Sequence, residues 1–175
     1  NIQSADQLKQ MIDNTKLYTS YPLFIAIDGE GSGTDAVAAA GLGTKTDSPE
    51  TIGASGDTNN AYTAGTTVGS YLAELGFNLD FAPAADLKVV DGNAAGSSSY
   101  GTDAATVARF GTEMARGIQA AGVMACAKHF PGHGDTAVDS HIGLPCIEKT
   151  MDELEACELI SFRAAIKAGI PAIMS

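Results

Sequence analysis

The sequence of 175 residues contains no tryptophan and only three cysteines, Cys126, Cys146 and Cys157, none of them in a Cys-x-x-Cys pair. An odd number of cysteines without that spacing argues against a disulfide framework and a cysteine-based zinc site. No run of 18 or more apolar residues occurs, so no membrane-spanning helix is predicted. The first residues lack the features of a signal peptide. Because the chain has no initiator Met, localisation, whether cytoplasmic or secreted to the cell surface, is left open.

Basic residues are also scarce. Ten Lys and Arg stand against 21 Asp and Glu, and the net charge is −11. An acidic surface repels phosphate backbones, so nucleic acid is not expected as a partner, and the charge is attributed to solubility. With 45% hydrophobic residues, the chain is able to bury one core of ordinary size.

A helix-to-strand pattern repeats along the chain. Periodic segments end at Gly76, Gly122 and Gly169, and glycine just past a helix end supplies a left-handed cap. A short apolar run follows each glycine. These runs cover residues 77–83, 123–131 and 170–175, after an earlier strand at 23–28. The pattern predicts an α/β fold with a parallel sheet.

Apolar side chains at helical spacing place the connecting helices at 59–75 and 103–121. Their apolar faces are Val68, Tyr71, Leu72 and Leu75, and Val107, Phe110, Met114 and Ile118. Capping boxes at Ser4 with Gln7 and at Thr150 with Glu153 begin two further helices. Their apolar faces are expected to be Leu8, Met11 and Ile12, and Leu154, Ile160 and Ile166. The stretches 29–56 and 84–102 are expected to be long loops of the functional kind.

All three histidines lie within fourteen residues, at the end of the strand expected at 123–131. The cluster comprises Lys128, His129, His133, Asp135, Asp139 and His141. In parallel α/β folds the site lies at the carboxyl ends of the strands. Asp28 and Asp86 follow two other strands, so we expect them near Lys128 and His129.

The spacing of Asp139 and His141 favours one side of an extended segment, where a carboxylate can orient an imidazole for proton transfer. The alternative is a loop pair that satisfies the backbone of turns. A metal site built from His133, Asp135, Asp139 and His141 is a further alternative. Its spacing matches no common zinc motif, so we expect neither metal nor cofactor.

Asp28 opens a Gly-rich stretch, Asp28-Gly29-Glu30-Gly31. A phosphate loop is disfavoured, because the stretch lacks the P-loop lysine and its two acids would repel phosphate. Asp28 is either a strand-end carboxylate that binds sugar hydroxyls or part of an acidic turn.

The stretch Lys128-His129-Phe130-Pro131-Gly132-His133-Gly134-Asp135, with Asp139-Ser140-His141, closely resembles the signature of family 3 glycoside hydrolases of the β-N-acetylglucosaminidase type. Two further segments resemble family motifs, and the likeness runs over essentially all 175 residues. They are Phe24-Ile25-Ala26-Ile27-Asp28-Gly29-Glu30-Gly31 and Gly76-Phe77-Asn78-Leu79-Asp80-Phe81-Ala82-Pro83-Ala84-Ala85-Asp86.

The resemblance implies that residues 1–175 are part of one barrel domain of the TIM-like (β/α)8 type, with about half of its strands present. It implies retaining cleavage of terminal β-linked N-acetylglucosamine through a covalent glycosyl-enzyme. The acid/base dyad would be His141 with Asp139, and Asp28, Lys128 and His129 would bind the sugar.

Several features depart from the family pattern or fall outside the chain. Ser98 stands where the family often has a sugar-binding Arg. The family's nucleophile, an Asp in a Ser/Thr-Asp-Asp segment, would follow Ser175, so none is assigned. We expect the chain to be an excerpt whose partner is the remainder of the same barrel. Alone it should lack glycosidase activity, expose strand edges and tend to associate.

Two other functions fit the resemblance. A non-catalytic sugar-binding module would agree with Ser98 and the unassigned nucleophile. A β-N-acetylglucosaminide phosphorylase would agree with a histidine acid/base, which does not repel phosphate as a carboxylate would. The natural sugar, from peptidoglycan fragments, chitin or another hexosaminide, is left open.

Overall fold

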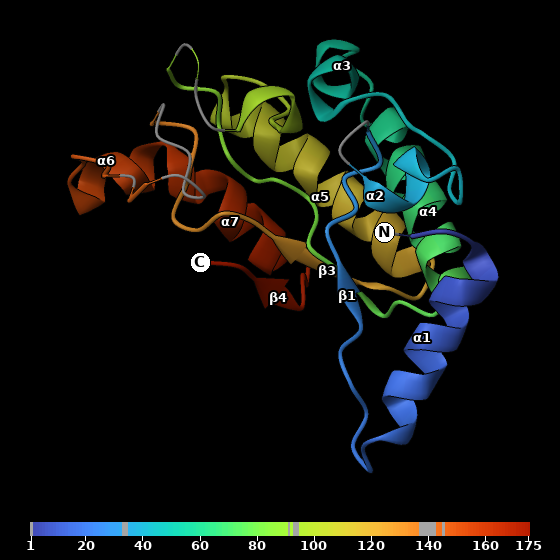
Figure 1. Ribbon diagram of the computed structural model, residues 1–175. Helices are drawn as coiled ribbons and strands as arrows, with labels where there is room; N and C mark the ends of the chain where they lie inside the picture. Colours follow the sequence, from blue (N-terminus) through green and yellow to red (C-terminus); the bar gives the residue numbers. More distant parts are fainter. Residues whose placement is uncertain (1, 33–34, 91, 93–94, 137–142, 145) are drawn as a thin grey trace.

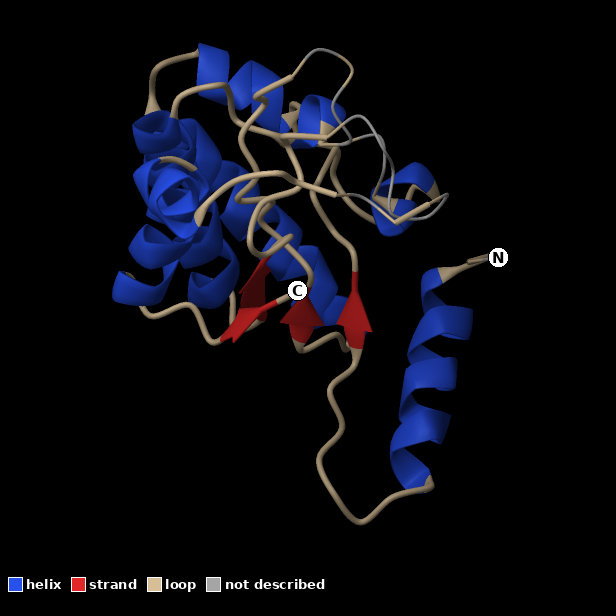
Figure 2. Cartoon of the chain, turned by 90° about the vertical axis from the view of Figure 1, so that its left-hand side faces the viewer, coloured by secondary structure: helices blue, strands red, loops and turns tan. Residues whose placement is uncertain are grey.

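The computed structural model describes residues 2–32, 35–90, 92, 95–136, 143–144 and 146–175. Within them, short parallel strands form one sheet in the order β1-β2-β3-β4. These strands are β1 (Ala26–Ile27), β2 (Leu79–Asp80), β3 (Met124–Ala127) and β4 (Ala172–Ile173). They point the same way, and the loops that follow them gather beyond their carboxyl ends (Figure 2). The predicted α/β class with a parallel sheet is confirmed.

Helices connect the strands and pack beside the sheet (Figure 1). They are α1 (Ala5–Leu17), α2 (Ala36–Ala39), α3 (Pro49–Ala54), α4 (Thr58–Leu75), α5 (Ala104–Ala120), α6 (Met151–Ala156) and α7 (Glu158–Lys167), with a 3-10 turn at Gly96–Ser98. Gly76, Gly122 and Gly169 follow the ends of α4, α5 and α7 with φ of 100°, 88° and 84°. The predicted glycine caps are therefore confirmed.

The long helices α4 and α5 lie against each other and form much of the core. All eight side chains predicted for their apolar faces are buried. The two backbones approach closely because glycines lie between them. A Cβ at Gly65 would be 2.2 Å from the Met114 carbonyl oxygen, and one at Gly117 would be 2.3 Å from that of Tyr62. Side chains at these positions would push the helices apart.

The stretch 29–56 is not one long loop, and this prediction was wrong. It contains α2 and α3, which begin at side-chain caps. Asp35 accepts hydrogen bonds from the backbone N–H groups of Val37 and Ala38, and Ser48 accepts one from Thr51. Pro49 occupies the start of α3. The composition suggested a loop because these helices are too short to show periodicity.

The segment after Thr150 departs from the prediction in another way. Its capping box is present, but the helix ends at Ala156, and Cys157 leaves helical geometry with φ −134° and ψ −86°. This break turns a different face of α7 to the core. The buried residues are Glu158, Leu159, Ser161, Phe162 and Ala165, whereas Ile160 and Ile166 are exposed. In α1, Leu8 and Ile12 are buried as predicted, but Met11 is exposed.

The strands that were predicted from long apolar runs are short, and side chains extend their pairing. Asn78, just before β2, donates from its side-chain amide to the Leu23 carbonyl and accepts from the Ile25 N–H.

In the part of the chain that is described, no helix is both long and apolar enough to cross a membrane.

Candidate functional site

Lys128 follows β3 directly and points at two carboxylates from the loop after β1. Its ammonium donates to Asp28 and lies 2.9 Å from Glu30 Oε1. The Lys128 side chain is almost completely buried and that of Glu30 nearly so, whereas 64% of the Asp28 side chain is exposed. The sheet register brings these residues together, because the carboxyl ends of parallel strands meet at one edge. The predicted proximity of Asp28 and Lys128 is thus observed.

Two opposing influences act on the Lys128 ammonium. Burial lowers its pKa, because the charged form loses hydration. The Glu30 and Asp28 carboxylates outweigh burial, and the pKa lies above its usual value. Lys128 is therefore a permanent cation at neutral pH. It holds two carboxylates in place at the edge of the sheet.

His129 is held by a buried carboxylate from the loop after β2. Its ring Nδ1 lies 2.8 Å from Asp86 Oδ2, and its backbone N–H donates to the same carboxylate. Asp86 also accepts from the backbone N–H of His133 at 2.7 Å. In the neutral ring, a carboxylate opposite Nδ1 favours the tautomer with its proton there, which leaves Nε2 as an acceptor. The sequence predicted that Asp86 lies nearby, but not that it orients His129.

A second buried carboxyl, Asp80 at the end of β2, supports the loop that carries Asp28 and Glu30. Its Oδ1 accepts from the Gly29 N–H at 2.8 Å, and Oδ2 has no partner among the described residues. Burial raises the pKa of Asp80 well above its usual value, against the lowering effect of the Gly29 bond. Burial of Asp80 therefore favours its neutral acid form. The motif included Asp80, but its role was missed because its burial depends on tertiary packing.

Ser98 lies in the same network. Its hydroxyl donates to Glu30 Oε2, the oxygen that does not face Lys128. Ser98, which stands where the resemblance implies an Arg, therefore contacts the acid that pairs with Lys128. Serine supplies a neutral donor there, so Lys128 is the cation that pairs with Glu30 in the described part of the chain.

The turn after His129 is pinned to the loop that carries Asp86. The Gly134 carbonyl accepts from the Val89 N–H at 3.1 Å. A Cβ at Gly134 would lie 1.3 Å from the Leu87 carbonyl oxygen, so only glycine fits this approach. Asp139 and His141, the predicted acid/base dyad, lie outside the described residues.

Two of the four residues considered as metal ligands, His133 and Asp135, are described. The Asp135 carboxylate pairs with Lys149 at 2.9 Å. Over the described ranges, no group of three or more His, Cys, Asp or Glu side chains is placed to hold a metal ion.

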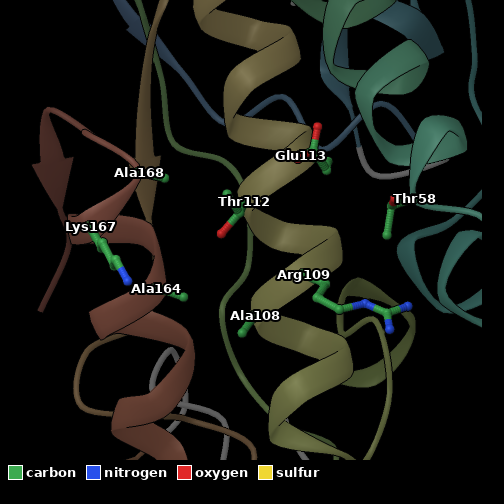
Figure 3. Close-up of a pocket in the computed structure, with 8 residues that line it drawn as sticks. All are labelled: Thr58, Ala108, Arg109, Thr112, Glu113, Ala164, Lys167 and Ala168. Carbon is green, nitrogen blue, oxygen red and sulfur yellow. The ribbon is translucent and has the colours of Figure 1, made fainter.

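A hollow of about 440 Å³ lies among α4, α5 and α7 (Figure 3). It is lined by Thr58, Ala108, Arg109, Thr112, Glu113, Ala164, Lys167 and Ala168. Thr112 points toward α7, whereas Arg109 extends toward Thr58. None of the strand-end side chains described above lines this hollow, so it is separate from the candidate site.

Several known proteins resemble this chain in sequence and in fold. A beta-hexosaminidase of Neisseria gonorrhoeae (strain NCCP11945) is 33% identical over 181 aligned residues, which cover 99% of this chain and 50% of that protein. The solved structure of a glycoside hydrolase family 3 beta-N-acetylglucosaminidase from Paenibacillus sp. str. FPU-7 is 38% identical, with a TM-score of 0.85 over 98% of this chain and 33% of its own. A beta-glucoside phosphorylase, BglX, is 25% identical, with a TM-score of 0.91 over 98% of this chain and 31% of its own.

The chain spans about half the length of the curated relatives that it matches first. The parallel sheet corresponds to part of the TIM-like barrel domain of these structures. All 175 residues match the model of the glycosyl hydrolase family 3 N-terminal domain. The chain therefore belongs to glycosyl hydrolase family 3.

Proposed function

We propose that the protein to which these residues belong is a retaining β-N-acetylhexosaminidase that cleaves terminal β-linked N-acetylglucosamine. The observation that carries the proposal is the convergence of Asp28, Lys128 and His129 at the carboxyl edge of the sheet, in a family 3 chain. The relatives named beta-hexosaminidase support the choice of sugar.

The convergent side chains suit neutral sugar hydroxyls. Asp28 is exposed enough to accept from a hydroxyl while it pairs with Lys128. An ammonium has three N–H donors, and two of those of Lys128 are directed at Asp28 and Glu30; we assign the third to a sugar oxygen. His129 presents Nε2 as an acceptor, and 39% of its side chain is exposed.

His141 and Asp139 supply the proton transfers. As a carboxylate from outside this chain attacks the anomeric carbon, His141 protonates the glycosidic oxygen and the aglycone leaves. A water molecule then attacks the glycosyl-enzyme and gives its proton to His141, which regenerates the carboxylate and the acid. Asp139 orients the imidazole and stabilises its protonated form. The support is the signature, in which both residues follow Lys128 and His129 at the family's spacing.

A phosphorylase is the second candidate, and the similarity to a beta-glucoside phosphorylase favours it. In that reaction phosphate, in place of water, attacks the glycosyl-enzyme and the product is a sugar 1-phosphate. The first half of the reaction is the same. The two candidates therefore differ only in the acceptor.

The test uses the protein expressed from its complete coding sequence and a chromogenic β-N-acetylglucosaminide. His141→Ala and Asp139→Ala should each lower kcat by about 100-fold or more, because positioned acid/base groups contribute about 10²–10⁴-fold. Asp28→Asn should chiefly raise KM. Turnover near wild type in the His141→Ala or Asp139→Ala variant would refute the dyad.

The acceptor is tested by running the reaction with phosphate and with an inert buffer. A hydrolase should give the free sugar in both. A sugar 1-phosphate that forms only with phosphate would identify a phosphorylase. Binding of N-acetylglucosamine without turnover would identify a non-catalytic module and overturn the proposed activity.

A further inference from the structure

An ionic cluster joins the two ends of the stretch that contains Asp139 and His141. Asp135 precedes this stretch and Lys149 follows it, and Lys149 Nζ lies 2.9 Å from Asp135 Oδ2. Lys149 also donates to Glu158, the first residue of α7. We call this cluster of Asp135, Lys149 and Glu158 the ionic clasp.

Glu158 anchors the clasp to the core. Its side chain is almost completely buried, and Oε2 has no partner among the described residues. Its methylene groups pack against the turn before Asp135, since a Cβ at Gly132 would lie 2.7 Å from Glu158 Cγ. One helical turn later, the Phe162 ring contacts Phe130 edge-on, with 5.3 Å between centroids. The face of α7 that carries Glu158 and Phe162 therefore contacts this turn at Phe130 and Gly132.

The clasp differs from the surface ion pairs of this chain. Arg163 and Glu155 also pair at 2.8 Å, but their side chains are 62% and 52% exposed. Such pairs contribute little, because water screens them and long side chains lose entropy. Loss of Lys149 would instead leave Glu158 buried without a counter-charge, which is strongly destabilising. The buried Glu158 carboxylate therefore depends on Lys149 for its counter-charge.

We propose that Asp135, Lys149 and Glu158 are positioning residues for the acid/base dyad, because they fix both ends of the stretch that carries it. This inference rests on the proposed function. Holding the ends of a loop together restricts the conformations open to the residues between them. Proton transfer is sensitive to this restriction, since a displacement of about 1 Å can cost about 100-fold in rate.

The test compares two leaving groups in the protein expressed from its complete coding sequence. Departure of phenoxide from a phenyl β-N-acetylglucosaminide needs protonation by His141, whereas 2,4-dinitrophenoxide leaves without it. Lys149→Met should lower kcat/KM for the phenyl substrate by about 10- to 100-fold and for the dinitrophenyl substrate by less than about 3-fold. Lys149→Arg keeps the charge and should restore most of the loss. Arg163→Met is the matched control and should change neither value.

A purely structural role would lower both values equally, so an equal loss in Lys149→Met would overturn the proposal. Wild-type values in that variant would also overturn it. Asp135→Asn, which preserves shape and leaves Glu158 paired, repeats the test should Lys149→Met fail to fold.

Hydrogen exchange gives a readout that does not depend on activity. Backbone amides in peptides that cover 130–136 and 148–153 should exchange faster in Lys149→Met than in the wild type or Arg163→Met. Unchanged exchange rates in these peptides would refute the proposed role of the ionic clasp. If the wild-type protein turned over neither substrate, the proposed function would fall, and exchange would still decide whether the clasp holds these segments.

Discussion

Replacement of Asp86 should separate the two tasks of this carboxylate, which supports the backbone and orients His129. Asp86 accepts from the backbone N–H groups of His129 and His133 and faces the His129 ring Nδ1. Asp86→Ala removes every one of these bonds. Asp86→Asn keeps one oxygen as an acceptor but replaces the other with an NH2 group.

The two variants should differ in how much they lower the free energy of unfolding. In Asp86→Ala, two half-buried N–H donors lose their partner, and since a fully buried donor costs about 1–3 kcal/mol, the free energy of unfolding should fall by at most about 2–6 kcal/mol. This is a large share of the roughly 5–15 kcal/mol that stabilises a typical protein. In Asp86→Asn, the amide oxygen is able to hold the His133 N–H, and the loss of charge assistance should cost about 1–2 kcal/mol.

The functional effect of Asp86→Asn should exceed its effect on stability. With an NH2 group opposite it, Nδ1 of His129 must accept, and its proton moves to Nε2. The acceptor proposed for a sugar hydroxyl then becomes a donor. Loss of one such bond, about 1.4 kcal/mol, corresponds to about a 10-fold rise in KM.

Urea unfolding and steady-state kinetics measure the two effects. Asp103→Asn is the matched control, since Asp103 caps α5 at the surface and Asn caps equally well. The control should leave stability and KM unchanged. If Asp86→Ala were as stable as Asp103→Asn, or if Asp86→Asn kept the wild-type KM, the assigned role of Asp86 would be refuted.

Two further predictions concern the support of the site. Because the raised pKa of Asp80 favours its protonated form in the folded state, the folded protein binds more protons than the unfolded chain above pH 4. This contribution to stability is therefore lost as pH rises through the raised folded-state pKa, and Asp80→Asn should gain stability relative to wild type over that rise in urea titrations that begin near pH 4. A difference that stays constant with pH would contradict this prediction. Gly134→Ala places a Cβ against the Leu87 carbonyl and should lower the free energy of unfolding by more than about 3 kcal/mol in the same assay. Gly122→Ala is the control, because Gly122 has a positive φ but open space around it, and its loss should be about half as large or smaller. Equal losses in the two glycine variants would contradict the close approach.

The sequence was sufficient to predict features whose signals are local. The apolar faces of α4 and α5 and the glycines after helices follow from spacing and backbone chirality. The neighbourhood of Asp28 and Lys128, which are a hundred residues apart, also followed, because parallel strands align their carboxyl ends. The alignment of parallel strands thus predicted a contact between residues that are far apart in the sequence.

The interactions that were missed depend on side-chain packing between elements. Nothing in the spacing around Glu158 shows that it reaches Lys149, or that Cys157 breaks the helix and turns Glu158 inward. The pairing of Asp86 with the His129 ring likewise depends on how two loops approach each other. Burial of an ionisable group is set by the whole fold, so local sequence patterns carry little information about it.

Lys128 and Lys149 are each paired with carboxylates in the described part of the chain. Lys128 holds Asp28 and Glu30, and Lys149 holds Asp135 and Glu158. Each ammonium contacts two carboxylates, so each group keeps a net negative charge. If the proposed function is correct, desolvation on sugar binding would strengthen these contacts, as in a preorganised site. A negatively charged edge of this kind is better suited to neutral sugar hydroxyls than to an anionic ligand, because an anion would compete with carboxylates already in place.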